Sequence, residues 1–72
     1  MTYEDLKRER ELLLEAIEKD LEILEFLPVT SNTTLARIVT NHRINMMVEL
    51  VHLLDKMLIE ERQKLLTKIH EN

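Results

Sequence analysis

Apolar residues recur every three or four positions along most of the chain, the spacing of one face of an α-helix. In the first segment the residues that share a face are Leu6, Leu13, Ile17, Leu21 and Leu24, with glutamates opposite. The pattern runs to Leu27 and stops at Pro28, because proline has no amide hydrogen and disfavours the α conformation of the preceding residue. We expect a helix over about residues 2–27, with Thr2 as N-cap and Asp5 completing a capping box.

A second helical pattern follows a short connection that begins at Pro28. Ser31 or Asn32 is the expected N-cap, and the helix covers about residues 32–70. Two helices joined by about five residues fold into an antiparallel hairpin. The predicted fold is therefore all-α, with one helical-hairpin domain over residues 1–72.

One alternative topology stays open for the second helix. Thr40, Asn41 and His42 are weak helix formers. A break at this point would leave a short helix over residues 33–40 and a long one over residues 42–70.

The middle of the second helix is apolar on most of its sides. Ten of the 14 residues from 46 to 59 are apolar, and a helix of that kind is buried on most sides. The second helix is also about 12 residues longer than the first, so its last turns would stand alone. Chains below about 70–80 residues seldom have a core worth more than about 3–5 kcal/mol. We therefore predict a homodimer that forms a four-helix bundle.

The predicted core and interface follow from these stripes. Leu12, Ile23 and Phe26 fall beyond the stripe of the first helix, and Arg10 and Asp20 lie close to it. The expected core of the first helix is Leu13, Ile17, Leu21 and Leu24, and that of the second is Met47, Leu50, Leu54, Met57 and Leu58. The expected dimer or partner interface is Met46, Met47, Leu50, Leu53, Leu54, Met57, Leu58, Leu65 and Ile69.

Composition removes several classes of function. The chain has no Cys and no Gly, which excludes disulfides, cysteine-based zinc sites and Gly-rich phosphate loops. Apolar runs stay far below the roughly 18 residues of a membrane span. We expect a cytoplasmic protein with no membrane partner, no cofactor and no metal. No Ser-His-acid set has a recognisable context, so no catalytic residue and no enzymatic activity are expected.

The net charge of −4 comes from 14 acidic and 10 basic residues, which are unevenly spread. Between Pro28 and Val48 there is no acidic residue. Arg37, His42 and Arg43 in this stretch have two interpretations. In the first, they pair with the first helix, where Arg37 is expected near Glu18, Asp20 or Glu22 and exposed pairs are worth about 0–1 kcal/mol. In the second, they form a basic patch that contacts an anionic partner.

Glu49 and His52 have the Glu-x-x-His spacing that di-metal bundles use. Both residues lie opposite the stripe of Met47, Leu50 and Leu54. A metal site in a bundle needs side chains that point inward, so a solvated face is the better interpretation of this motif.

These observations favour a small, non-enzymatic protein–protein interaction module or regulator that acts as a homodimeric bundle. Two alternatives involve nucleic acid. Residues 34–46 faintly match a helix-turn-helix unit, with Thr40 in the turn and Met46 as apolar anchor, which would make the protein a DNA-binding regulator. The acidic first helix could instead mimic DNA and inhibit a nucleic-acid-binding protein.

Overall fold

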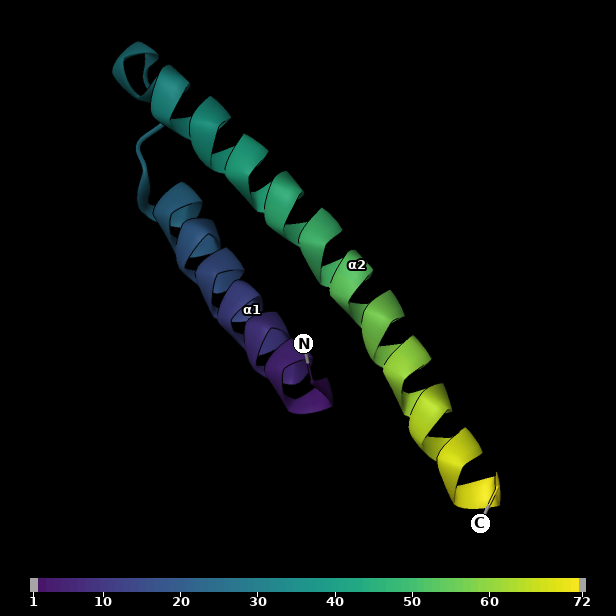
Figure 1. Cartoon of the computed structure of the whole chain (residues 1–72). Coiled ribbons are helices and arrows are strands. Elements are labelled where there is room, and N and C mark those ends of the chain that lie inside the picture. Colours follow the sequence, from purple (N-terminus) through teal and green to yellow (C-terminus); the bar gives the residue numbers. More distant parts are fainter. Residues whose placement is uncertain (1, 72) are drawn as a thin grey trace.

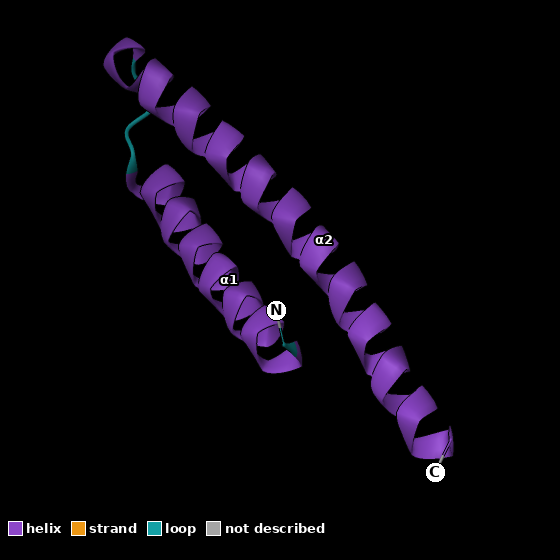
Figure 2. Cartoon of the chain, in the orientation of Figure 1, coloured by secondary structure: helices purple, strands orange, loops and turns teal. Residues whose placement is uncertain are grey.

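The computed structural model describes residues 2–71 of the chain, with the side chains of residues 2–70. Helix α1 spans Tyr3–Phe26, the 3-10 turn η1 spans Ser31–Thr33, and helix α2 spans Thr34–Glu71 (Figure 1). The two α-helices run antiparallel, and the described residues include no strand (Figure 2). The molecule is a rod of 63 × 15 × 14 Å. The predicted all-α helical hairpin is confirmed.

The start of α1 is held by the predicted capping box. The Thr2 hydroxyl accepts a hydrogen bond from the Asp5 amide at 3.2 Å, and the Asp5 carboxylate accepts one from the Thr2 amide at 3.3 Å. This backbone hydrogen bond from Thr2 is the main reason that the pKa of Asp5 is lowered. At the other end, Leu27 is extended, with φ −71° and ψ 126°, as expected of a residue before proline.

The connection leads into α2 through a 3-10 turn that was not predicted. Ser31 and Asn32 lie inside η1, and Thr30 precedes it as N-cap. The Thr30 amide donates to the Thr33 hydroxyl, and the Thr34 hydroxyl donates to the Thr30 carbonyl, each at 3.2 Å. The Thr33 hydroxyl also donates to the carbonyl of Pro28. Several neighbouring residues here have side chains that suit a cap, and the fold selects among them by tying η1 back to Pro28.

Helix α2 is continuous from Thr34 to Glu71, so the alternative with a break near Asn41 is wrong. Thr40 stays within the helix because its hydroxyl donates to the carbonyl of Ala36 at 2.7 Å, which satisfies the polar group locally. A weak propensity over three residues does not outweigh packing against α1.

The two helices meet along one line of residues, here called the inner seam. Its members alternate spacings of three and four, the heptad pattern of packed helices. From α1 they are Leu6, Arg10, Leu13, Ile17, Asp20 and Leu24, and from α2 they are Thr40, Ile44, Met47, Val51, Leu54 and Leu58, all buried or half-buried. Leu6 is the most deeply buried apolar side chain, with 1 % exposed.

Two of the predicted core residues are not in the core. Leu21 is 51 % exposed and Leu50 is 46 % exposed. On α1 the seam passes through Asp20 in place of Leu21, and on α2 it passes through Val51 in place of Leu50. The neighbouring position lies about 100° around the helix, so a shift of one residue turns a side chain out of the seam.

Candidate functional site

Helix α2 carries a second line of apolar side chains beside the inner seam. We call it the outer stripe, and it consists of Val39, Met46, Leu50, Leu53 and Met57. Its first four members are between 46 % and 54 % exposed, and Met57 is half-buried. Arg43 occupies the stripe between Val39 and Met46. The spacing is again three, four or seven, so α2 repeats a packing pattern on a side that α1 does not cover.

Helix α1 adds apolar residues to the same side of the hairpin. Arg43 of the outer stripe reaches Asp20, which shows which side of α1 lies next to the stripe. At 100° per residue, Leu12, Ile23 and Phe26 all lie to that side of Asp20. They are 53 %, 44 % and 79 % exposed. Together with the outer stripe they form what we call the broad face.

The predicted interface residues fall into two groups. Those in the first group are exposed: Met46, Leu50, Leu53, Leu65 and Ile69. Met47, Leu54 and Leu58 are half-buried in the inner seam, and Met57 is half-buried beside it. The predicted set therefore combines residues that pack against α1 with residues that are free to meet a second molecule. Sequence reasoning left Leu12, Ile23 and Phe26 out of the interface, although their positions beyond the first stripe were the available signal.

Two ion pairs cross between the helices at charged positions of the inner seam. Asp20 accepts two hydrogen bonds from the Arg43 guanidinium, from Nε at 2.6 Å and from Nη2 at 2.9 Å. The hydrogen bond from Arg43 lowers the pKa of Asp20, and the same contact raises the pKa of Arg43. Near the open end of the hairpin, Arg10 Nε donates to Asp55 at 2.5 Å. Both pairs join residues far apart in sequence, and both place opposite charges where the helices meet.

The predicted contact residues Arg37, His42 and Arg43 do not form one patch. Successive members are separated by at least about 100° around α2, so the three point to different sides. Arg37 is half-buried, and its Nε has no hydrogen-bond partner among the described residues. His42 is exposed, and Arg43 holds Asp20. The pairing with the acidic end of α1 thus involves Arg43 and Asp20, and the prediction that Arg37 makes it is wrong.

Glu49 and His52 are both exposed, as the sequence predicted for this motif. The described residues contain no cluster of three or more His, Cys, Asp or Glu side chains with the geometry of a metal site. Within the described part of the chain, no helix combines the length and the apolar character that crossing a membrane requires.

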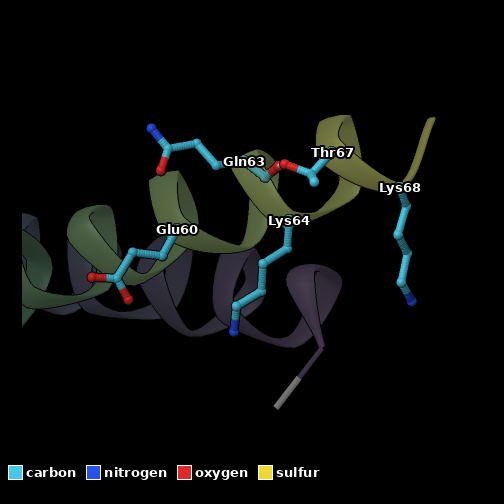
Figure 3. Close-up of a pocket in the computed structure, with 5 residues that line it drawn as sticks. All are labelled: Glu60, Gln63, Lys64, Thr67 and Lys68. Carbon is cyan, nitrogen blue, oxygen red and sulfur yellow. The ribbon is translucent and has the colours of Figure 1, made fainter. Parts of the chain in front are cut away.

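A hollow of about 530 Å³ lies along α2 near its C-terminal end. Figure 3 shows its lining side chains, which are Glu60, Gln63, Lys64, Thr67 and Lys68. All five come from one helix and are exposed. One helix cannot enclose a ligand, so this hollow offers no small-molecule site of the usual concave kind. The broad face is the candidate functional surface.

The chain matches no protein-family model, no curated protein and no solved structure.

Proposed function

We propose that this chain is a non-enzymatic interaction module that works as a homodimer and binds another protein. In the dimer, the broad faces of two hairpins pack together into a four-helix bundle. The observation that carries the proposal is the outer stripe, an exposed apolar line at heptad spacing on a helix whose inner seam is already occupied. Contiguous apolar patches of this length mark interaction sites on soluble proteins.

The accessible surface area of the hairpin supports a second copy of the chain as the partner. The hairpin exposes 5962 Å², whereas a compact monomer of its mass exposes about 4,700 Å². The excess, about 1,300 Å², is within the range that one protomer buries in an obligate dimer. The radius of gyration, 17.4 Å, likewise exceeds the value of about 11 Å for a compact domain of this length.

Light scattering across a dilution series tests the homodimer. The expected mass is twice the 8.6 kDa of one chain, since an interface of that size withstands dilution. The double variant Leu50→Glu/Leu53→Glu places two charges in the broad face, and we expect it to be monomeric while keeping its helical circular dichroism. Asn45→Glu/His52→Glu is the matched control, because both residues are exposed on other sides of α2. A wild-type chain that stays monomeric at every concentration contradicts the proposal.

No structural observation favours the two nucleic-acid alternatives. A helix-turn-helix unit needs a turn at Thr40, and residues 34–46 lie within the continuous helix α2. Retention on DNA at rising salt tests this alternative directly, with Arg37→Ala/Arg43→Ala as the variant. Asp20→Asn is its control, because the loss of Arg43 also breaks the pair with Asp20.

A further inference from the structure

Helix α2 continues well past the start of α1 (Figure 1). Tyr3, the first residue of α1, lines a shallow hollow of about 310 Å³ with Asp55, Leu58, Ile59 and Arg62 of α2. From Arg62 at this hollow, residues 62–70 extend past the start of α1 and are here called the overhang (Figure 1). Leu65 and Ile69 follow Leu58 by 7 and 11 residues, so they continue the line of the inner seam. They are 49 % and 69 % exposed.

The most exposed large apolar side chains lie at the two ends of the rod. Phe26, Val29 and Leu35 are 79 %, 81 % and 72 % exposed, and all three surround the connection between the helices. We call them the turn patch. Ile69, the next most exposed, lies at the opposite end of a molecule that is 63 Å long. One hairpin cannot bring these two apolar ends together.

The two ends also have complementary charges. The overhang contains three bases and no acid; Lys64 pairs with the preceding Glu61 at 3.2 Å, which leaves Arg62 and Lys68 to face another molecule. The C-terminal turns of α1 contain Glu22 and Glu25, and the last turn has no basic residue. Acidic side chains near the negative end of the helix dipole are unfavourable unless a cation lies close by. A base from another molecule would supply that cation.

We propose that the second copy lies antiparallel, so that the overhang of each chain packs on the turn patch of the other. This inference rests on the proposed homodimer and specifies its geometry. A twofold axis near Leu50, in the middle of the outer stripe, brings Ile69 of one chain level with η1 of the other, because both are about 19 residues, roughly 29 Å, from Leu50. Leu65 and Ile69 then meet Phe26 and Val29, and the bases of the overhang lie near Glu22 and Glu25.

A parallel dimer brings no overhang onto a turn patch and no overhang base near Glu22 or Glu25. It places the two overhangs at the same end, where Arg62 and Lys68 of each chain lie near those of the other. Like charges that lie close together repel. No overhang then reaches a turn patch, because the two lie at opposite ends of the dimer.

Crosslinking between introduced cysteines distinguishes the two orientations, since the chain has no Cys of its own. The double variant Asn32→Cys/Lys68→Cys places its thiols about 50 Å apart within one chain, because some 36 residues of mostly helical chain separate them. A much shorter bis-maleimide therefore links residues 32 and 68 only between chains. Mass spectrometry on mixed labelled and unlabelled protein identifies the linked peptides. Each single-cysteine variant serves as a control.

The expected result is a covalent dimer linked between residues 32 and 68, with no dimer from Lys68→Cys alone. A doubled mass with 68–68 links from the single variant overturns the antiparallel arrangement and leaves the homodimer standing. A doubled mass with neither link also overturns it. A monomeric mass at all concentrations refutes the homodimer itself.

A second pair of variants tests the overhang separately. Leu65→Ser/Ile69→Ser is expected to weaken dimerisation by about tenfold or more, since it removes the apolar contact with the turn patch. Gln63→Ser/Thr67→Ser changes polar positions of the same turns and should leave the dissociation constant unchanged. Equal dissociation constants for both variants contradict the role of the overhang.

Discussion

The inner seam and the outer stripe are both mainly apolar, and they differ in their burial and in the polar residues that they contain. The seam between the helices includes Arg10, Asp20 and Thr40, and Asp20 and Thr40 are buried. The outer stripe has Arg43 as its one polar member among five apolar residues, four of them exposed. The hairpin therefore includes polar groups in a mostly apolar seam and leaves a second apolar line outside. Such a chain leaves much of its apolar surface for association.

The charges of the inner seam give the hairpin its register. Arg10 meets Asp55 and Asp20 meets Arg43, so the signs alternate along each helix. Sliding α1 by one heptad along α2 breaks both pairs and leaves Asp20 partly buried without a partner, which is strongly unfavourable. Polar residues at seam positions of packed helices commonly select one register at a cost in stability. The comparison separates two roles: the seam specifies which hairpin forms, and the stripe supplies the driving force for a partner.

The largest expected effect distinguishes the inner seam from the outer stripe at two adjacent residues, Leu54 and Leu53. Leu54→Asp places an unpaired charge in the inner seam, and we expect loss of most helical circular dichroism together with dissociation. Leu53→Asp places the same charge in the outer stripe, and we expect dissociation with the helicity retained, as judged by light scattering and circular dichroism. Equal helicity in the two variants, at wild-type mass, would mean that neither line packs as described.

A smaller effect distinguishes the buried seam from the exposed flank of α1. Leu6→Ala removes the most buried apolar side chain, and we expect a loss of about 2–5 kcal/mol in the free energy of unfolding. Leu21→Ala, at a position 51 % exposed, should cost about 1 kcal/mol or less in the hairpin. Urea unfolding at one fixed protein concentration measures both, because association shifts apparent stability. A larger loss for Leu21→Ala would place the seam on the wrong side of α1.

The smallest expected effect is a pH dependence that arises in the seam. Because Arg43 lowers the pKa of Asp20, ionised Asp20 stabilises the folded chain. That contribution is complete above the ordinary aspartate pKa of about 3.9. It is lost as the pH falls below that value and through the lower pKa that Asp20 has in the folded protein. We expect the Asp20→Asn variant to have a lower urea midpoint at pH 7, and to lose less of that midpoint between pH 6 and pH 3 than the wild type.

Asp5→Asn provides the comparison for this experiment, because the pKa of Asp5 is also lowered, by hydrogen bonds from Thr2 at the helix start. Both variants should therefore lose less of their urea midpoint between pH 6 and pH 3 than the wild type. Asp20→Asn alone should also disturb the contact between the helices. If Asp20→Asn lost as much of its urea midpoint between pH 6 and pH 3 as the wild type, the pair with Arg43 would not stabilise the folded state.

Local signals along the chain were enough for the elements of the hairpin. The capping box at Thr2 and Asp5 and the end of α1 before Pro28 each depend on a few neighbouring residues, and both were predicted correctly. The 3-10 turn before α2 was not predicted, because Thr30, Ser31, Asn32 and Thr33 all have side chains suited to capping a helix. Only the hydrogen bonds of Thr33 and Thr34 back to Thr30 distinguish them.

The candidate surface was harder to predict, for a reason visible at Leu50 and Val51. Helix α2 is apolar on so many sides that two heptad lines fit its sequence about equally well. Periodicity shows that both exist, and it does not show which one faces α1. The predicted interface therefore mixed Leu54 and Leu58 of the inner seam with Leu50 and Leu53 of the outer stripe.

By itself, the sequence determined that this chain forms two amphipathic helices of unequal length joined by a short turn. Helix propensity, capping and proline act within a few residues of one another, so no distant contact is needed to predict them. Tertiary structure alone decided the pairing of Asp20 with Arg43 and of Arg10 with Asp55, and with it the rotation of each helix about its axis. That rotation results from fitting two whole surfaces together, and it selects which of two similar apolar lines is buried and which remains exposed for a partner.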